Sequence, residues 1–139
     1  HMDGSGAYKV HRPEHWAFSN TDIRVNDEFG GEETIVGYEC DGCEMEWRDG
    51  LPYPTGNDGT PKNFQILATA SARWHPDDSE WYDAWKPGHE GCAVMGSYQQ
   101  GGMVFTAGTT DWAHGLAGKN ATVDKVTKNV LDKLSFPLK

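Results

Sequence analysis

One stretch near the C-terminus carries the clearest helical pattern in the chain. Between Thr122 and Leu134, apolar side chains recur at helical spacing and therefore fall on one stripe. Pro137 follows, and proline cannot continue a helix. The rest of the sequence is interrupted by 17 glycines and seven prolines, which predict many turns and few long helices. The chain is therefore expected to form an α/β domain, with one C-terminal amphipathic helix packed on a sheet.

The remaining apolar runs are short and rich in β-branched or aromatic residues, as is typical of strands. Strands are expected at residues 16–18, 34–40, 64–69, 93–98 and 103–107, so that a small mixed sheet of about four to six strands results. The last two runs flank a glycine-containing loop, which predicts a hairpin. Residues 42–62 are expected to be a long irregular loop, and a short helix is expected to begin near Thr110 or Asp111.

Charge and length limit the class of protein. A net charge of −9 without a basic cluster argues against nucleic-acid binding. No apolar run has membrane length and no signal peptide is seen, so no membrane association is expected. Three cysteines do not suit a secreted disulfide scaffold, which favours the cytoplasm. The pair His1-Met2 is typical of a tag remnant, so a single domain is expected over residues 3–139.

Two cysteine-containing pairs have the spacing of metal ligands. Cys40 and Cys43 form a Cys-x-x-Cys motif, and His89 with Cys92 forms a His-x-x-Cys pair. Together they would make a Cys₃His set, a common structural zinc site. The alternative is that the cysteines are small core residues and His89 is a loop residue. The sequence leaves both interpretations open.

Three acidic residues follow predicted strands closely. Glu39 and Asp41 end the run at 34–40, and Asp111 comes soon after the run at 103–107. If these strands are neighbours, the carboxylates would share a cleft and could divide general acid and base roles. The alternative is turn and cap chemistry, with Asp41 before Gly42 and Asp111 at a helix start.

Other polar and aromatic groups favour structural roles. The acidic segments 44–49 and 57–59 lack the ligand spacing of a calcium loop and are expected to be solvated. His15, His75 and His114 are isolated, and each is expected to be a packed or surface residue. The cluster Trp74, Trp81, Tyr82 and Trp85 is interpreted as part of long aromatic loops, either as core or as a protein-binding face.

Six segments resemble those of a known family and occur in the same order: 12–18, 26–30, 35–42, 60–68, 101–112 and 126–131. Through them the chain is similar over most of its length to the C-terminal region of the N,N-dimethylformamidase large (beta) subunit.

This resemblance implies part of a glutamine-amidotransferase-like architecture, in an amide hydrolase that uses mononuclear iron. In that family an upstream His-x-Glu-Tyr-Trp segment supplies iron ligands, and this chain contains no such segment. No iron ligand or nucleophile is therefore assigned to a position here. The chain is expected to lack the iron-binding catalytic half, and its expected partner is that half or a second copy of itself.

The functional prediction is accordingly a domain of an amide (formamide) hydrolase large subunit. If the domain is catalytic, the expected reaction is metal-assisted hydrolysis of a C–N amide bond, with Zn or Fe as the metal. Glu39, Asp41 and Asp111 would then be the general acids and bases. The alternatives are a small structural zinc module and a protein- or ligand-binding domain without catalysis.

Overall fold

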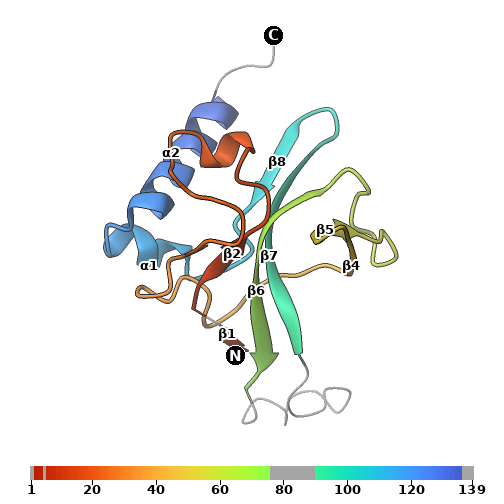
Figure 1. The fold of residues 1–139 in the computed structure, drawn as a ribbon, viewed down its shortest axis with the longest axis horizontal. Helices are drawn as coiled ribbons and strands as arrows, with labels where there is room; N and C mark the ends of the chain where they lie inside the picture. The colour runs from red at the N-terminus through yellow and green to blue at the C-terminus, as the bar shows by residue number, and fades with distance from the viewer. Residues whose placement is uncertain (1, 5, 76–89, 136–139) are drawn as a thin grey trace.

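A computed structural model describes residues 2–4, 6–75 and 90–135 (Figure 1). The main sheet has six strands, and a separate hairpin and a helical layer complete the fold. The main sheet comprises β1 (Met2–Gly4), β2 (Tyr8–Val10), β3 (Glu28–Phe29), β6 (Gln65–Trp74), β7 (Glu90–Gln99) and β8 (Met103–Thr106). The hairpin is β4 (Met45–Arg48) and β5 (Leu51–Pro54), and the helices are the 3₁₀ helix η1 (Trp16–Phe18), α1 (Trp112–Ala117) and α2 (Ala121–Ser135).

The strand order of the main sheet is β3-β2-β6-β7-β8, with β1 paired to the far end of β6. Every ladder among the described residues is antiparallel, so the expectation of a mixed sheet is wrong. A parallel pair needs a long crossover connection, whereas the β7–β8 link is a short glycine turn. The prediction of an α/β fold with a C-terminal helix is confirmed.

Helix α2 and the β7–β8 hairpin agree well with the sequence patterns. The predicted hairpin is β7–β8, the predicted strand at 64–69 is the first half of β6, and α2 covers the predicted helix. The short helix α1 follows Asp111, as expected. These elements were predictable because their apolar residues repeat with a regular period.

Three local expectations are wrong. Residues 34–40 form turns with isolated bridges in place of a strand, because Thr34 takes a positive φ of 54° and breaks the extended run. Residues 16–18 form η1, whose first turn is capped by the side chain of His15. The loop 42–62 contains the β4–β5 hairpin, which Asp49 and Gly50 close with φ values of 51° and 78°. Two positive φ values in succession are typical of a tight hairpin turn.

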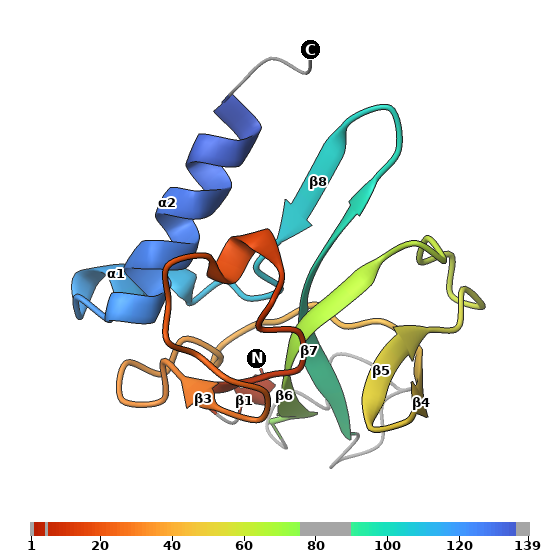
Figure 2. The same ribbon diagram turned by 45° about the horizontal axis from the view of Figure 1, so that its top comes forward.

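The core lies between the main sheet and α2. Figure 2 shows α2 and the β4–β5 hairpin on opposite sides of the long β6–β7 ladder. Val123 and Val126 of α2 are fully buried, whereas Leu131 and Leu134 are 61% and 45% exposed. The predicted apolar stripe is therefore buried at its start and exposed at its end.

Two histidines, His11 and His15, are held by hydroxyl groups of the sheet. His11 is 5% exposed, and its Nε2 lies 2.7 Å from Thr69 Oγ1 on β6. The Nε2 of His15 lies 3.0 Å from Ser97 Oγ on β7, and its Nδ1 accepts the N–H of Ala17. Burial lowers the pKa of each histidine to about 4, so both are neutral at pH 7.

These two groups should make the fold sensitive to acid. An unfolded histidine titrates near its ordinary pKa of 6.5, so between that pH and pH 4 the unfolded chain binds protons that the folded chain rejects. Unfolding free energy should therefore fall as pH decreases through this window, by up to about 1.4 kcal/mol per pH unit for His11 and less for the half-buried His15. Urea unfolding at about pH 7 and about pH 5 measures this loss.

His11→Gln should reduce the loss between these two pH values, since glutamine retains a polar group but does not titrate. The exposed His114 provides the control, and His114→Gln should leave the loss unchanged. An identical acid loss in wild type and His11→Gln would contradict the assignment.

Candidate functional site

The predicted acidic residues lie on a segment that runs beside the chain after β8. Cys40 forms an isolated bridge with Thr109. The Asp41 N–H donates to the carbonyl oxygen of Gly108 at 3.0 Å, and the Thr110 N–H donates to that of Glu39 at 3.1 Å. The condition for a shared cleft is thus met, since the two segments are neighbours, although neither is a regular strand there.

An open pocket of about 500 Å³ lies where these segments meet. Its lining is Glu39, Cys40, Asp41, Thr106, Ala107, Gly108, Thr109 and Thr110. Glu39 and Asp41 are exposed, so both carboxylates are accessible to solvent. A lining of carboxylates and hydroxyls is rich in hydrogen-bond acceptors, which suits ligands that donate hydrogen bonds. A catalytic role for either acid remains a prediction.

Asp111 lies beside this pocket but is engaged by the backbone. Its Oδ2 accepts the N–H of Tyr38 at 2.7 Å, and its Oδ1 accepts the Thr110 hydroxyl at 3.4 Å. It occupies the N-cap position of α1 without a side-chain cap hydrogen bond. The side chain thus joins the two segments that bear the pocket, and its predicted acid–base role is untested.

Gly108 allows the close approach that forms the pocket floor. Its φ is +68°, and an added Cβ would lie 2.1 Å from the Val94 carbonyl oxygen and 2.9 Å from the Tyr8 hydroxyl oxygen. That hydroxyl donates to the Ala107 carbonyl at 2.7 Å, and burial raises the pKa of Tyr8 well above its ordinary range. The floor therefore has no room for any side chain at position 108.

Gly108→Ala should destabilise the protein strongly. We expect a loss of roughly 2–5 kcal/mol in unfolding free energy, from steric overlap together with the left-handed backbone. Gly101→Ala is a matched control, since Gly101 has a φ of +69° but no atom within 4 Å of its added Cβ. The control should lose only about 1–2 kcal/mol, the strain of the backbone alone. Equal losses in thermal or urea unfolding would contradict the packing argument.

The segment that bears Cys40 and Cys43 lies against Cys92. Gly42 sits against Cys92, because a Cβ on Gly42 would be 2.2 Å from the Cys92 carbonyl oxygen. Cys92 also interacts electrostatically with both Cys40 and Cys43. Burial is the largest cause that raises the pKa of Cys40 and of Cys43 to about 11, so neither is a thiolate at pH 7.

Only three of the four predicted metal ligands lie within the described residues. The fourth, His89, lies outside the described residues, as do Trp81, Tyr82 and Trp85 of the aromatic cluster and the side chain of Trp74. Within the described part of the chain, no group of three or more His, Cys, Asp or Glu side chains is arranged to hold a metal ion. Zinc or iron binding therefore stays a prediction.

Metal analysis of the purified protein would test it. If the Cys₃His site exists, the protein should retain about one zinc per chain, since three cysteine thiolates and one histidine bind zinc tightly. Cys43→Ser should then lose the zinc, while a serine substitution at an exposed position far from the thiols, such as Ala117→Ser, should retain it. A metal-free wild-type protein with an unaltered far-UV circular dichroism spectrum would contradict the zinc hypothesis.

The pair of His15 and Ser97 has the composition of a base and a nucleophile, and the sequence contained no signal for it. The geometry favours a structural role. Because Nδ1 of His15 accepts the Ala17 N–H, the hydrogen of the neutral ring lies on Nε2 and is donated to Ser97. A ring in this tautomer cannot remove the serine proton. The pair instead fixes η1 to β7.

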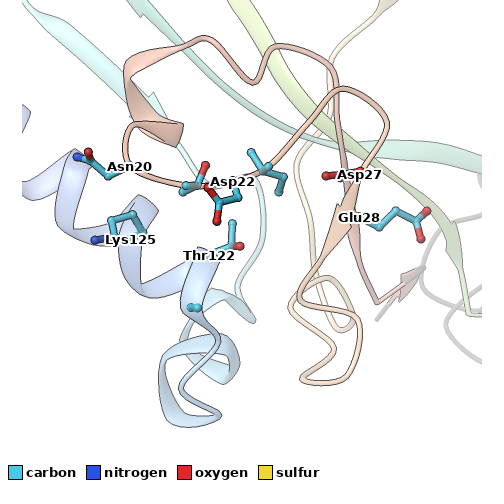
Figure 3. A pocket seen from close by; sticks show the side chains of 9 residues that line it. Asn20, Asp22, Asp27, Glu28, Thr122 and Lys125 are labelled. Carbon is cyan, nitrogen blue, oxygen red and sulfur yellow. The ribbon is translucent and has the colours of Figure 1, made fainter.

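A second open pocket of about 480 Å³ lies at the start of α2. Figure 3 shows its labelled side chains, which come from the chain between η1 and β3, from the start of β3 and from the first turns of α2. Its labelled residues are Asn20, Asp22, Asp27, Glu28, Thr122 and Lys125. Asp27 is partly engaged, since its Oδ2 accepts the Arg24 N–H at 2.8 Å. No sequence motif indicated this pocket, because its residues are single side chains from separate turns.

The acidic loop around β4 and β5 binds its own hairpin. Asp58 accepts the N–H groups of Glu44 and Thr60 at 2.6 and 3.0 Å, and these hydrogen bonds lower its pKa. Glu44 Oε1 accepts from the Thr55 hydroxyl and the Asn57 amide. Glu44 and Asp58 are thus exposed residues outside the strands, as expected, whereas Glu46 lies on β4.

Together these features define an α/β domain with an antiparallel sheet, one covering helix and open polar pockets. None of the helices in the described residues is long and apolar enough to span a membrane. A family model described as "N,N-dimethylformamidase beta subunit-like, C-terminal" matches residues 1–127. The chain belongs to this family. No curated protein and no solved structure was found to match it.

Proposed function

We propose that this chain is the C-terminal domain of an amide hydrolase subunit, and that the metal-dependent chemistry is supplied by residues outside it. The observation that carries the proposal is the family match over residues 1–127, whose description names a beta subunit and its C-terminal part. A beta subunit implies at least one partner, so the rest of the hydrolase is the expected partner. The glutamine-amidotransferase-like architecture is proposed for that larger enzyme.

The side chains of the described residues support this division of labour. His11 and His15 are neutral and already hydrogen-bonded to hydroxyls, which leaves little basicity for catalysis. The Cys40 and Cys43 thiols have raised pKa values, which makes them weak nucleophiles at pH 7. Glu39 and Asp41 are the exposed carboxylates of the 500 Å³ pocket, so they would form one wall of a shared site.

The proposal predicts that the isolated chain does not hydrolyse formamides. Incubation with N,N-dimethylformamide and a panel of other formamides should release amine only at the background rate, with and without added Fe²⁺ or Zn²⁺. Circular dichroism and a cooperative unfolding transition should show that the same sample is folded.

Turnover that scales with protein concentration would overturn the proposal. In that case the predicted acids become the first residues to test, since a general acid or base typically raises the reaction rate by about 10²–10⁴-fold. Glu39→Gln and Asp41→Asn should then lose that activity, and Asp22→Asn in the second pocket is the matched control.

A zinc module and a binding domain without catalysis are the other candidate functions. The proximity of Cys92 to the Cys40–Cys43 pair favours the zinc module, and the metal analysis described above decides it. A homo-oligomer would appear in the molar mass measured by light scattering. We place the protein in the cytoplasm as part of the proposal.

A further inference from the structure

The segment from Cys40 to Cys43, here termed the thiol strap, crosses β7 and carries one wall of the 500 Å³ pocket. Its contact with β7 is direct, because the Val94 N–H donates to the Asp41 carbonyl oxygen at 2.8 Å. Gly42 lies against the carbonyl group of Cys92, so closely that a Cβ there would meet that oxygen at 2.2 Å. The strap and Cys92 are therefore in backbone contact.

This contact places Cys43 next to the residue that touches the Cys92 backbone. Consecutive Cα atoms are about 3.8 Å apart, and disulfides join Cα atoms about 4.4–6.8 Å apart. Cys43 is the residue after Gly42, whereas Cys40 is two residues before it and is held by its bridge to Thr109. All three cysteines are free and half-buried.

We propose that Cys43 and Cys92 form a reversible disulfide that ties the thiol strap to β7. This inference concerns these two thiols alone and does not rest on the proposed hydrolase function. The oxidant of the two thiols is a low-molecular-weight disulfide. Cys40 remains a free thiol in both states.

The reaction balances as two thiol–disulfide exchanges. At alkaline pH, where part of the thiol is deprotonated, one cysteine thiolate attacks the small disulfide, forms a mixed disulfide and releases one small thiol. The second cysteine then attacks the protein sulfur of that mixed disulfide and releases the other small thiol. The protein loses two electrons and two protons, and the small disulfide gains both. Excess dithiothreitol reverses the sequence.

The bond would restrain the wall of the pocket. Asp41 belongs to the strap and lines the pocket, and the backbone hydrogen bonds described for it run to Val94 and Gly108. A covalent link one or two residues away limits how far the Asp41 carboxylate can move. Oxidation would therefore restrain Asp41, the exposed acid of the strap, although neither Cys43 nor Cys92 lines the pocket.

The test uses the whole chain, freed of metal with a chelator and incubated with oxidised glutathione. Free thiols are then counted with a chromogenic disulfide, and alkylation with peptide mapping locates the bond. The expected result is the loss of two of the three thiols, a mass decrease of two hydrogens, and alkylation at Cys40 alone. The melting temperature should rise, and dithiothreitol should reverse that rise.

Serine variants separate the pair from its neighbour. Cys43→Ser and Cys92→Ser should each prevent the intramolecular bond, whereas the matched control Cys40→Ser should form it as the wild type does. Circular dichroism establishes that each variant is folded. Three reactive thiols after oxidation, a bond that includes Cys40, or a bond only between two chains would each overturn the proposal.

Discussion

The antiparallel ladder between β6 and β7 is the interaction on which the other elements depend. Both strands are ten residues long, and their register runs from Gln65–Ser97 to Arg73–Glu90 with one irregularity near Ile66. Short strands on each side add to this ladder, but none of them could stand alone, because a few residues bury too little apolar surface. The ladder also carries Thr69 and Ser97, the hydroxyl partners of the two neutral histidines.

Much of the remaining chain is irregular, and specific side chains satisfy its backbone groups. Arg12 donates to the carbonyl oxygens of Ile66 and Pro52 and so joins the β4–β5 hairpin to the main sheet. Asn129 of α2 donates to the carbonyls of Ala17 and Ser19, which anchors η1. Since buried carbonyl groups without partners are costly, these long-range donors make a loop-rich fold possible in a chain of this size.

The pocket beside β8 also depends on specific long-range contacts. The Tyr8 hydroxyl fixes Ala107, and the absence of a side chain at Gly108 lets the Val94 carbonyl approach. The chain after β8 can then run next to Glu39–Asp41, where acids, hydroxyls and thiols meet on one surface. Within the family of N,N-dimethylformamidase beta subunit-like C-terminal domains, this surface is the feature that we connect with a shared site.

The sequence by itself determined α2, the β7–β8 hairpin and the family, because periodic apolar residues, turn glycines and collinear motifs are local signals. It left open whether residues near 40 and 110 would meet. Only the tertiary structure decided that residues 34–40 bend into turns, that His15 pairs with Ser97, and that Cys92 lies against the thiol strap. The physical reason is that strand register and backbone contacts between distant segments depend on how the whole core packs, which no short stretch of sequence encodes.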